Sequence, residues 1–289
     1  MTQSDAESIL AQAADAYRVA LGPRLEAVYA IGSLAHGGFS PLVSDIDLAL
    51  VVSDPLGPDD GETIQAVADA ERSKGSELGE RLSVFWGSPC TLRGERDGGR
   101  FPALDRLDLI EHGRLLSGTE ARVGLPRPST SELLITGAEF ALDFLAGGRG
   151  PTGPPTERLG SIRPAGEDTI EEIRRPEVLL ARGVRRVTKL VLFPVRFLFT
   201  AATGRVGTND AAVAHYLQRG DAPARALVGA ALAWRAIPPT DDQAAAGLLR
   251  EQMLPLYLHY IEDHITRLQG LGQSGLAGEF ARWRERLVR

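Results

Sequence analysis

Two aspartates separated by one residue open an apolar run, and they are the clearest chemical feature of the sequence. Asp45 and Asp47 lie in Ser44-Asp45-Ile46-Asp47, directly before the apolar residues 48–52. Because successive side chains on a strand point to opposite faces, a strand here places both carboxylates on one face. Adjacent carboxylates repel each other unless a cation lies between them, and oxygen ligands of this kind suit Mg²⁺. We therefore expect Asp45 and Asp47 to bind a magnesium ion.

A glycine–serine turn precedes this acid pair. Gly32-Ser33 follows the apolar run 28–31, which indicates a buried strand. Glycine has no Cβ, so the backbone at Gly32 can approach a ligand closely. Ser33 stands where a helical turn begins, so its hydroxyl and nearby backbone N–H groups can face an anion. The turn and the acid pair together indicate a nucleoside triphosphate bound with Mg²⁺, whereas either one alone would fit an ordinary turn or a solvated strand end.

This pattern, GS followed by SDIDL, resembles the nucleotidyltransferase superfamily with the DNA polymerase β-like fold. In that family the Gly-Ser loop holds the triphosphate and the two aspartates bind Mg²⁺. The resemblance implies nucleotide binding at Gly32, Ser33 and Ser44. It also implies that Asp45 and Asp47 are both the metal ligands and the catalytic residues.

The C-terminal half resembles one particular group within this superfamily. Residues 190–217 read LVLFPVRFLFTAATGRVGTNDAAVAHYL and residues 226–235 read ALVGAALAWR. This stretch is similar to the helical domain of the aminoglycoside 3″/9-type (streptomycin/spectinomycin) adenylyltransferases. The resemblance implies Mg²⁺-dependent transfer of AMP from ATP to a hydroxyl of a small, aminoglycoside-like molecule. It further implies a cleft between two domains for both substrates and a role in antibiotic resistance.

The general base expected from this resemblance is missing. The family carries a third carboxylate on the next core strand, and the equivalent position here is Ser83. A serine holds its proton too tightly to accept another at neutral pH, and Glu80 would lie on the opposite face of the strand. Asp108 and Asp105, in the segment after that strand, are the candidate replacement bases.

A second departure concerns the basic residue that contacts the nucleotide in the family. Its position is occupied by Asn209, so Arg205 or Arg219 would have to substitute. The second domain also offers acidic groups for a polycationic sugar, with Glu171, Glu172 and Asp210 as candidates.

Two other functions remain open at this stage. The chain could adenylylate a protein, as an antitoxin does to a toxin, although the large second domain argues against this. It could also be a catalytically impaired nucleotide-binding descendant, which Ser83 favours. Nucleic-acid polymerisation is disfavoured by the net charge of −6 and the isoelectric point of about 5.5.

Composition sets the remaining limits. The chain has 289 residues, of which 43% are hydrophobic and 24% charged, as in globular proteins. Cys90 is the single cysteine, so no internal disulfide forms, which is typical of the cytoplasm. The polar N-terminus shows no signal-peptide pattern, and no apolar run is long enough to span a membrane. We expect a cytoplasmic monomer or weak dimer whose partner is a small hydroxylated, cationic substrate rather than a nucleic acid or membrane.

The periodicity predicts an α/β (α+β) nucleotidyltransferase domain with a short mixed sheet over residues 1–126, followed by an all-α helical-bundle domain over 127–289. In the first domain we expect a helix over 4–20, capped by Ser4 with Glu7, and a second over 61–79. A third strand at 82–86, an exposed loop at 93–100, a helical turn at 105–112 and a strand at 114–116 follow.

The second domain reads as helices throughout. Expected helices cover 129–146, 178–202, 209–218, 222–235 and 241–268. Pro176 fits a first helical position, Pro194 should kink its helix and Gly204 should end it. Residues 147–174, rich in glycine and proline, are expected to form a long loop that acts as a lid.

Overall fold

The computed structural model describes residues 2–146 and 168–289, and these residues form two compact units. The first unit runs to Pro128, and the second contains the described residues from Ser129 to Arg289. Each unit has its own elements and core, so each is described by itself.

The first unit alternates helices with strands of a single four-stranded sheet. The strands and helices run in the order α1 (Gln3–Leu21), η1 (Gly22–Arg24), β1 (Leu25–Ile31), α2 (Gly32–His36), β2 (Ile46–Val52), α3 (Asp60–Arg72), η2 (Gly79–Arg81), β3 (Leu82–Gly87), α4 (Pro89–Leu92), α5 (Ala103–His112) and β4 (Arg114–Gly118). The expected third and fourth strands are therefore confirmed, and the expected turn at 105–112 is a helix of three turns.

The sheet is mixed, as predicted, with strand order β3-β2-β1-β4. β1 pairs with both β2 and β4 in antiparallel fashion, whereas β2 and β3 are parallel. Ile31, the last residue of β1, pairs with Asp47, and Asp47 pairs on its other side with Ser83. The central strand β2 thus holds Asp47 between the end of β1 and the start of β3, and Asp45 lies just before this strand.

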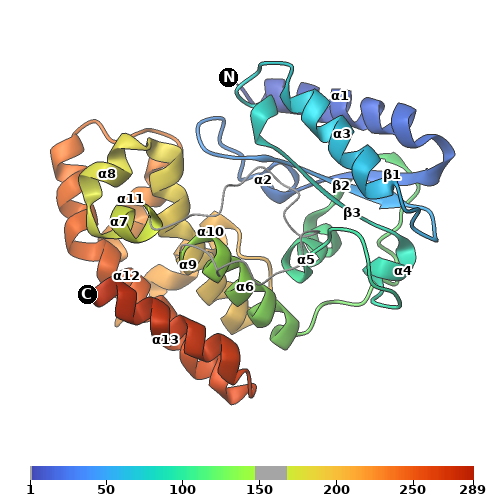
Figure 1. Cartoon of the computed structure of the whole chain (residues 1–289). Coiled ribbons are helices and arrows are strands. Elements are labelled where there is room, and N and C mark those ends of the chain that lie inside the picture. Colours follow the sequence, from blue (N-terminus) through green and yellow to red (C-terminus); the bar gives the residue numbers. More distant parts are fainter. Residues whose placement is uncertain (1, 147–167) are drawn as a thin grey trace. The chain divides into compact units, whose positions relative to one another are not determined.

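Each face of the sheet has its own apolar core (Figure 1). On one face, α1 and α3 cover the even-numbered residues of β2, including Leu48 and Leu50. On the other face, Leu109 of α5 and Leu92 of α4 pack against Ala49 and its neighbours. Asp47 has the same parity as Ala49, so it points to this second face, which we call the acid face.

Two helix boundaries in the first unit differ from the sequence prediction. The capping box of α1 is formed by Thr2 and Asp5 rather than by Ser4 and Glu7, because an equally good pattern lies two residues earlier. Helix α3 ends at Arg72, well before Gly79, since Lys74-Gly75 and the following polar residues leave the helix.

The second unit consists of helices among its described residues. They are α6 (Thr130–Phe144), α7 (Asp168–Arg174), α8 (Pro176–Ala181), α9 (Val184–Thr203), α10 (Asn209–Gln218), α11 (Arg225–Trp234), α12 (Asp242–Gly270) and α13 (Ser274–Val288). The long helix α12 packs against α13, α9 and α8. Tyr257, Tyr260 and Trp283 are buried where α12 and α13 meet.

The predicted helices of this unit are confirmed with two corrections. Residues 168–174 form α7 instead of the end of a loop, and the rest of the expected lid, 147–167, lies outside the described residues. The apolar stretch 178–202 is split at Gly183, whose φ of 86° ends α8 before α9 begins. Pro194 lies inside α9, and Gly204 ends it in the left-handed conformation as expected.

Within the described ranges, no helix combines the length and apolar character that a membrane crossing requires.

Candidate active site

The Gly-Ser turn and the acid pair meet in the structure at Gly32 and Asp47. Gly32 directly follows the pairing of Ile31 with Asp47 and has a φ of 65°. A Cβ at this position would lie 2.3 Å from Oδ2 of Asp47, well inside contact distance. Only glycine combines this backbone angle with so close an approach. The first residue of the predicted phosphate loop therefore lies directly against the predicted metal ligand.

Asp108 reaches the same glycine from α5. The backbone N–H of Gly32 donates a hydrogen bond of 2.6 Å to Oδ2 of Asp108, across 76 positions of sequence. Asp108 is only 9% exposed, so the bond is shielded from water. Asp47 and Asp108 thus contact one residue, and Asp105 lies half-buried one turn earlier on α5.

The contact between α5 and α2 has a second point. The ring of His112, the last residue of α5, packs edge-on against that of His36, the last residue of α2, with centroids 5.6 Å apart. Asp108 and His112 are one helical turn apart, as are Gly32 and His36, so the two helices meet along matching faces. This contact fixes α2, which is too short to be stable by itself.

Ser83 lies beside Asp47, as its strand position predicts. The parallel register pairs Asp47 with Ser83, and both residues are half-buried. Glu80 lies before the strand in η2. No carboxylate of β3 therefore stands next to Asp47 on this face.

The remaining predicted residues are neighbours of Gly32 and Asp47 in the sequence. Asp45 is half-buried and directly precedes β2, and Ser33 is the second residue of α2. Ser44 is buried, and its hydroxyl accepts a hydrogen bond of 2.9 Å from the N–H of Ser40. Ser44 therefore closes the turn that leads to Asp45.

Asp45 and Asp47 offer carboxylate oxygens, which are the kind of ligand that Mg²⁺ takes in proteins. Over residues 2–146 and 168–289, no group of three or more His, Cys, Asp or Glu side chains is arranged to hold a metal ion. The pair of half-buried carboxylates agrees with the habit of Mg²⁺, which keeps several waters and takes one or two carboxylates together with substrate phosphate oxygens.

Arg100 lies on the acid face, which the sequence does not predict, because residues 93–100 are expected to form an exposed loop. Residues 93–99 are exposed, but Arg100 is half-buried and its backbone pairs with Trp86. Its guanidinium lies 4.9 Å from the ring centre of Phe85, on the acid face. The only signal in the sequence is the pair Gly98-Gly99, which lets the chain turn onto the edge of β3.

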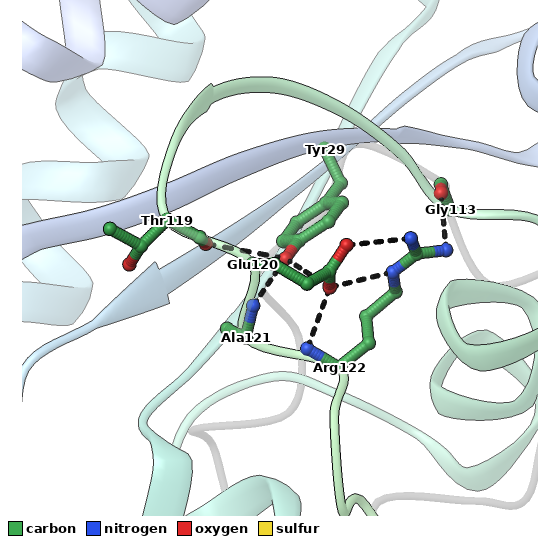
Figure 2. Close-up of polar contacts among 6 residues, drawn as sticks. All are labelled: Tyr29, Gly113, Thr119, Glu120, Ala121 and Arg122. Carbon is green, nitrogen blue, oxygen red and sulfur yellow. Dashed lines mark hydrogen bonds and ion pairs between the residues drawn. The ribbon is translucent and has the colours of Figure 1, made fainter.

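A polar network holds the chain that leaves β4 against the same face (Figure 2). The phenol of Tyr29 accepts a hydrogen bond of 2.6 Å from the N–H of Ala121 and donates one of 2.9 Å to Glu120. Arg122 binds both oxygens of Glu120 and also donates to the carbonyl of Gly113. These bonds, with the bond from Arg122 strongest, lower the pKa of Glu120 to about 2.

The acidic candidates of the second unit differ in their burial and in their ion pairs. Glu172 is 3% exposed and binds Arg186 at 2.6 Å and Arg182 at 3.3 Å, so the expectation that it faces a cationic substrate is wrong. Glu171 pairs with Arg175 one turn later on the helix surface. Asp210 is exposed in the first turn of α10.

The basic candidates of this unit lie near α10. Asn209 is buried, and Thr208, not Asn209, caps the helix. Arg205 is exposed, and Arg219 lies 3.8 Å from Asp221.

The mixed four-stranded sheet with a helical C-terminal region is a nucleotidyltransferase fold. The chain is similar in particular to the crystal structure of spectinomycin adenylyltransferase AAD(9) from Enterococcus faecalis with ATP and spectinomycin. The TM-score is 0.51 at 14% identity, over 86% of this chain and 98% of that chain. No protein-family model matches the chain, and no curated protein matches it. At this identity the likeness establishes the fold.

Proposed function

We propose that this chain is a Mg²⁺-dependent nucleotidyltransferase that transfers AMP from ATP to a hydroxyl of a small, aminoglycoside-like molecule. The observation that carries the proposal is the contact at Gly32. Because this residue has no Cβ, the backbone of the proposed phosphate loop lies directly against the carboxylate of Asp47. The similar structure, AAD(9), contains ATP and spectinomycin, which supports ATP as the co-substrate and a drug-like acceptor.

Each residue of the site has a role in this reaction. The acceptor oxygen attacks the α-phosphorus, a new P–O bond forms, and the bond to the bridging oxygen breaks so that pyrophosphate leaves. Asp45 and Asp47 would hold Mg²⁺, which when bound neutralises charge on the phosphate oxygens. Ser33 and the backbone of α2 would bind the outer phosphates, and Ser44 keeps Asp45 in place through the turn that it closes.

Asp108 is our first choice for the group that takes the proton of the attacking hydroxyl, with Asp105 as the second. Asp108 contacts Gly32, the residue that also contacts Asp47, so it lies at the centre of the site. Asp105 lies one turn away on the same helix. Either carboxylate would supply the function that Ser83 lacks.

Mass spectrometry of the reaction products tests the function. The protein is incubated with ATP, Mg²⁺ and a panel of streptomycin- and spectinomycin-type compounds, beside the double variant Asp45→Ala, Asp47→Ala. We expect a product heavier by one AMP unit that is absent with the double variant. The same product formed by both proteins would overturn the assignment of the two aspartates.

The variant Asp108→Asn separates a base from a positioning residue. Asparagine keeps an oxygen that accepts the Gly32 N–H but cannot take a proton. If Asp108 is the base, kcat falls by about 10²–10⁴ and the acidic limb of its pH profile is lost. If kcat changes little, Asp108 only positions the loop, and Asp105→Asn is the next variant.

A second function is favoured by one observation. Ser83 stands directly beside Asp47, where a carboxylate base would be expected. A descendant that binds Mg²⁺ and ATP without transferring AMP would fit this arrangement. Its signature is ATP binding that requires Mg²⁺ and is lost in the double variant, with no product from any acceptor.

A further inference from the structure

Arg100 is held at a fixed point on the open edge of β3. Its N–H donates 2.7 Å to the carbonyl of Trp86, and the N–H of Trp86 donates 3.0 Å to the carbonyl of Arg100. Gly99 has a φ of 74°, and a Cβ there would lie 2.5 Å from the Trp86 carbonyl oxygen. The close approach of the two backbones leaves little freedom for Arg100, although the preceding residues 93–99 are exposed.

The side chain of Arg100 is fixed as well. Its guanidinium stacks over Phe85 at 4.9 Å, and Nη1 donates to the carbonyl of Val84. Phe85 lies two residues after Ser83, so both side chains are on the acid face. The guanidinium therefore lies on the face of the sheet that carries Ser83 and Asp47.

A structural role alone accounts poorly for a half-buried charge at this place. Capping the Val84 carbonyl needs one neutral donor, whereas partial burial of a guanidinium costs free energy. Burial lowers the pKa of Arg100, the carboxylate of Asp105 opposes this shift, the charge of Arg72 adds to it, and the carboxylate of Asp47 opposes it.

We propose that Arg100 binds a phosphate oxygen of the nucleotide next to the acid pair, an inference that rests on the proposed function. Asp47 and Asp108 both contact Gly32, and a triphosphate bound there would add further negative charge. A planar guanidinium matches the geometry of phosphate oxygens, and the stack on Phe85 holds its plane before the ligand arrives. Arg100 then acts as the cation of the site on the β3 side.

The test is calorimetric binding of α,β-methylene-ATP with Mg²⁺, a probe that cannot transfer AMP. Arg100→Met keeps the bulk without the charge, and Arg100→Lys keeps the charge without the planar fork. Arg93→Met is the matched control, because Arg93 is exposed in the same segment and pairs with Glu95. We expect Arg100→Met to bind the probe at least about tenfold more weakly than the parent protein does. Arg100→Lys should have an intermediate affinity, and the affinity of Arg93→Met should be unchanged.

Two controls keep the result decisive. Binding by Arg100→Met within about twofold of the parent, with a lower Tm, would overturn the proposal and leave Arg100 as an edge cap. If Arg100→Met does not fold, the comparison uses Arg100→Lys. An affinity of that variant equal to the parent's would overturn the proposed contact between the planar guanidinium of Arg100 and a phosphate. Absence of binding by the parent protein itself would instead reject the proposed function.

Discussion

The two faces of the sheet are built from the same strands but have different contents. On the face covered by α1 and α3, the strands contribute aliphatic residues such as Leu48, Leu50 and Val84 to a continuous core. On the acid face, the same strands contribute Asp47 and Ser83, and α5 adds Asp105 and Asp108. The first face is therefore apolar core throughout, whereas the acid face combines a smaller apolar core with the polar groups of the proposed chemistry.

This division teaches which properties a substitution should change. Removing a side chain from the aliphatic face creates a cavity and lowers stability. Removing a charge from the acid face relieves repulsion between carboxylates and should cost activity instead. Variants on the two faces test that division.

Asp47→Asn should lower the rate of AMP transfer by about 10²–10³ without lowering Tm, because the amide keeps the shape but not the charge. Activity is measured with saturating ATP and Mg²⁺, and Tm by calorimetry. Asp59→Asn, at an exposed position before α3, is the control. A large drop in Tm with little loss of rate would contradict the division between the faces.

Leu50→Ala should lower the free energy of unfolding by about 2–5 kcal/mol, because Leu50 is completely buried in the aliphatic core. The rate per folded molecule should stay that of the parent. Urea unfolding gives the first quantity, and activity below the transition gives the second. A specific loss of activity would mean that this face reaches the site.

Gly32→Ala should disturb both properties, because it combines strain with a collision. Its positive φ costs about 1–2 kcal/mol for a residue with a Cβ, and the new methyl would displace Asp47. Gly37→Ala is the matched control, since Gly37 also has a positive φ but open space around it. Equal losses of activity in the two variants would show that the contact with Asp47 is irrelevant.

Glu120→Gln should have the smallest effect, up to about 1 kcal/mol at neutral pH, because the pair with Arg122 is partly exposed. Since the folded-state pKa of Glu120 is lowered to about 2, its contribution is present above the unfolded-state value near 4.3 and is lost as pH falls toward 2. The difference in the free energy of unfolding between the parent protein and Glu120→Gln should therefore shrink as the pH falls from about 5 to about 2. A constant difference over this range would rule out the charge as its source.

Local patterns predicted the elements of the fold, because hydrophobic periodicity and turn residues act within a few positions. The strand around Asp47 and the end of α9 at Gly204 follow from such signals. The break at Gly183 was missed because apolar residues continue on both sides of it. Helix α7 was missed because proline and glycine nearby suggested a loop, although its own residues are acidic and helix-compatible.

Part of the candidate site was predictable from the family resemblance. The resemblance gave Ser83 the position of the third carboxylate on the next strand, and the parallel register pairs Ser83 with Asp47. The bond from Gly32 to Asp108 could not be anticipated in the same way, because it depends on how α5 packs against α2. Arg100 lies at the end of an exposed segment, and only the pairing with Trp86 brings it to the acid face.

The outer edge of β3 bears on how this protein behaves at high concentration. Nε of Arg72 donates a hydrogen bond to the carbonyl of Leu82, and the guanidinium of Arg100 donates one to the carbonyl of Val84. The backbone N–H and carbonyl of Arg100 pair with the carbonyl and N–H of Trp86. Open strand edges invite another chain to extend the sheet, which leads to aggregation. A second molecule could add a strand here only by displacing two guanidinium groups. The residues that complete this edge therefore also oppose edge-to-edge self-association of the protein.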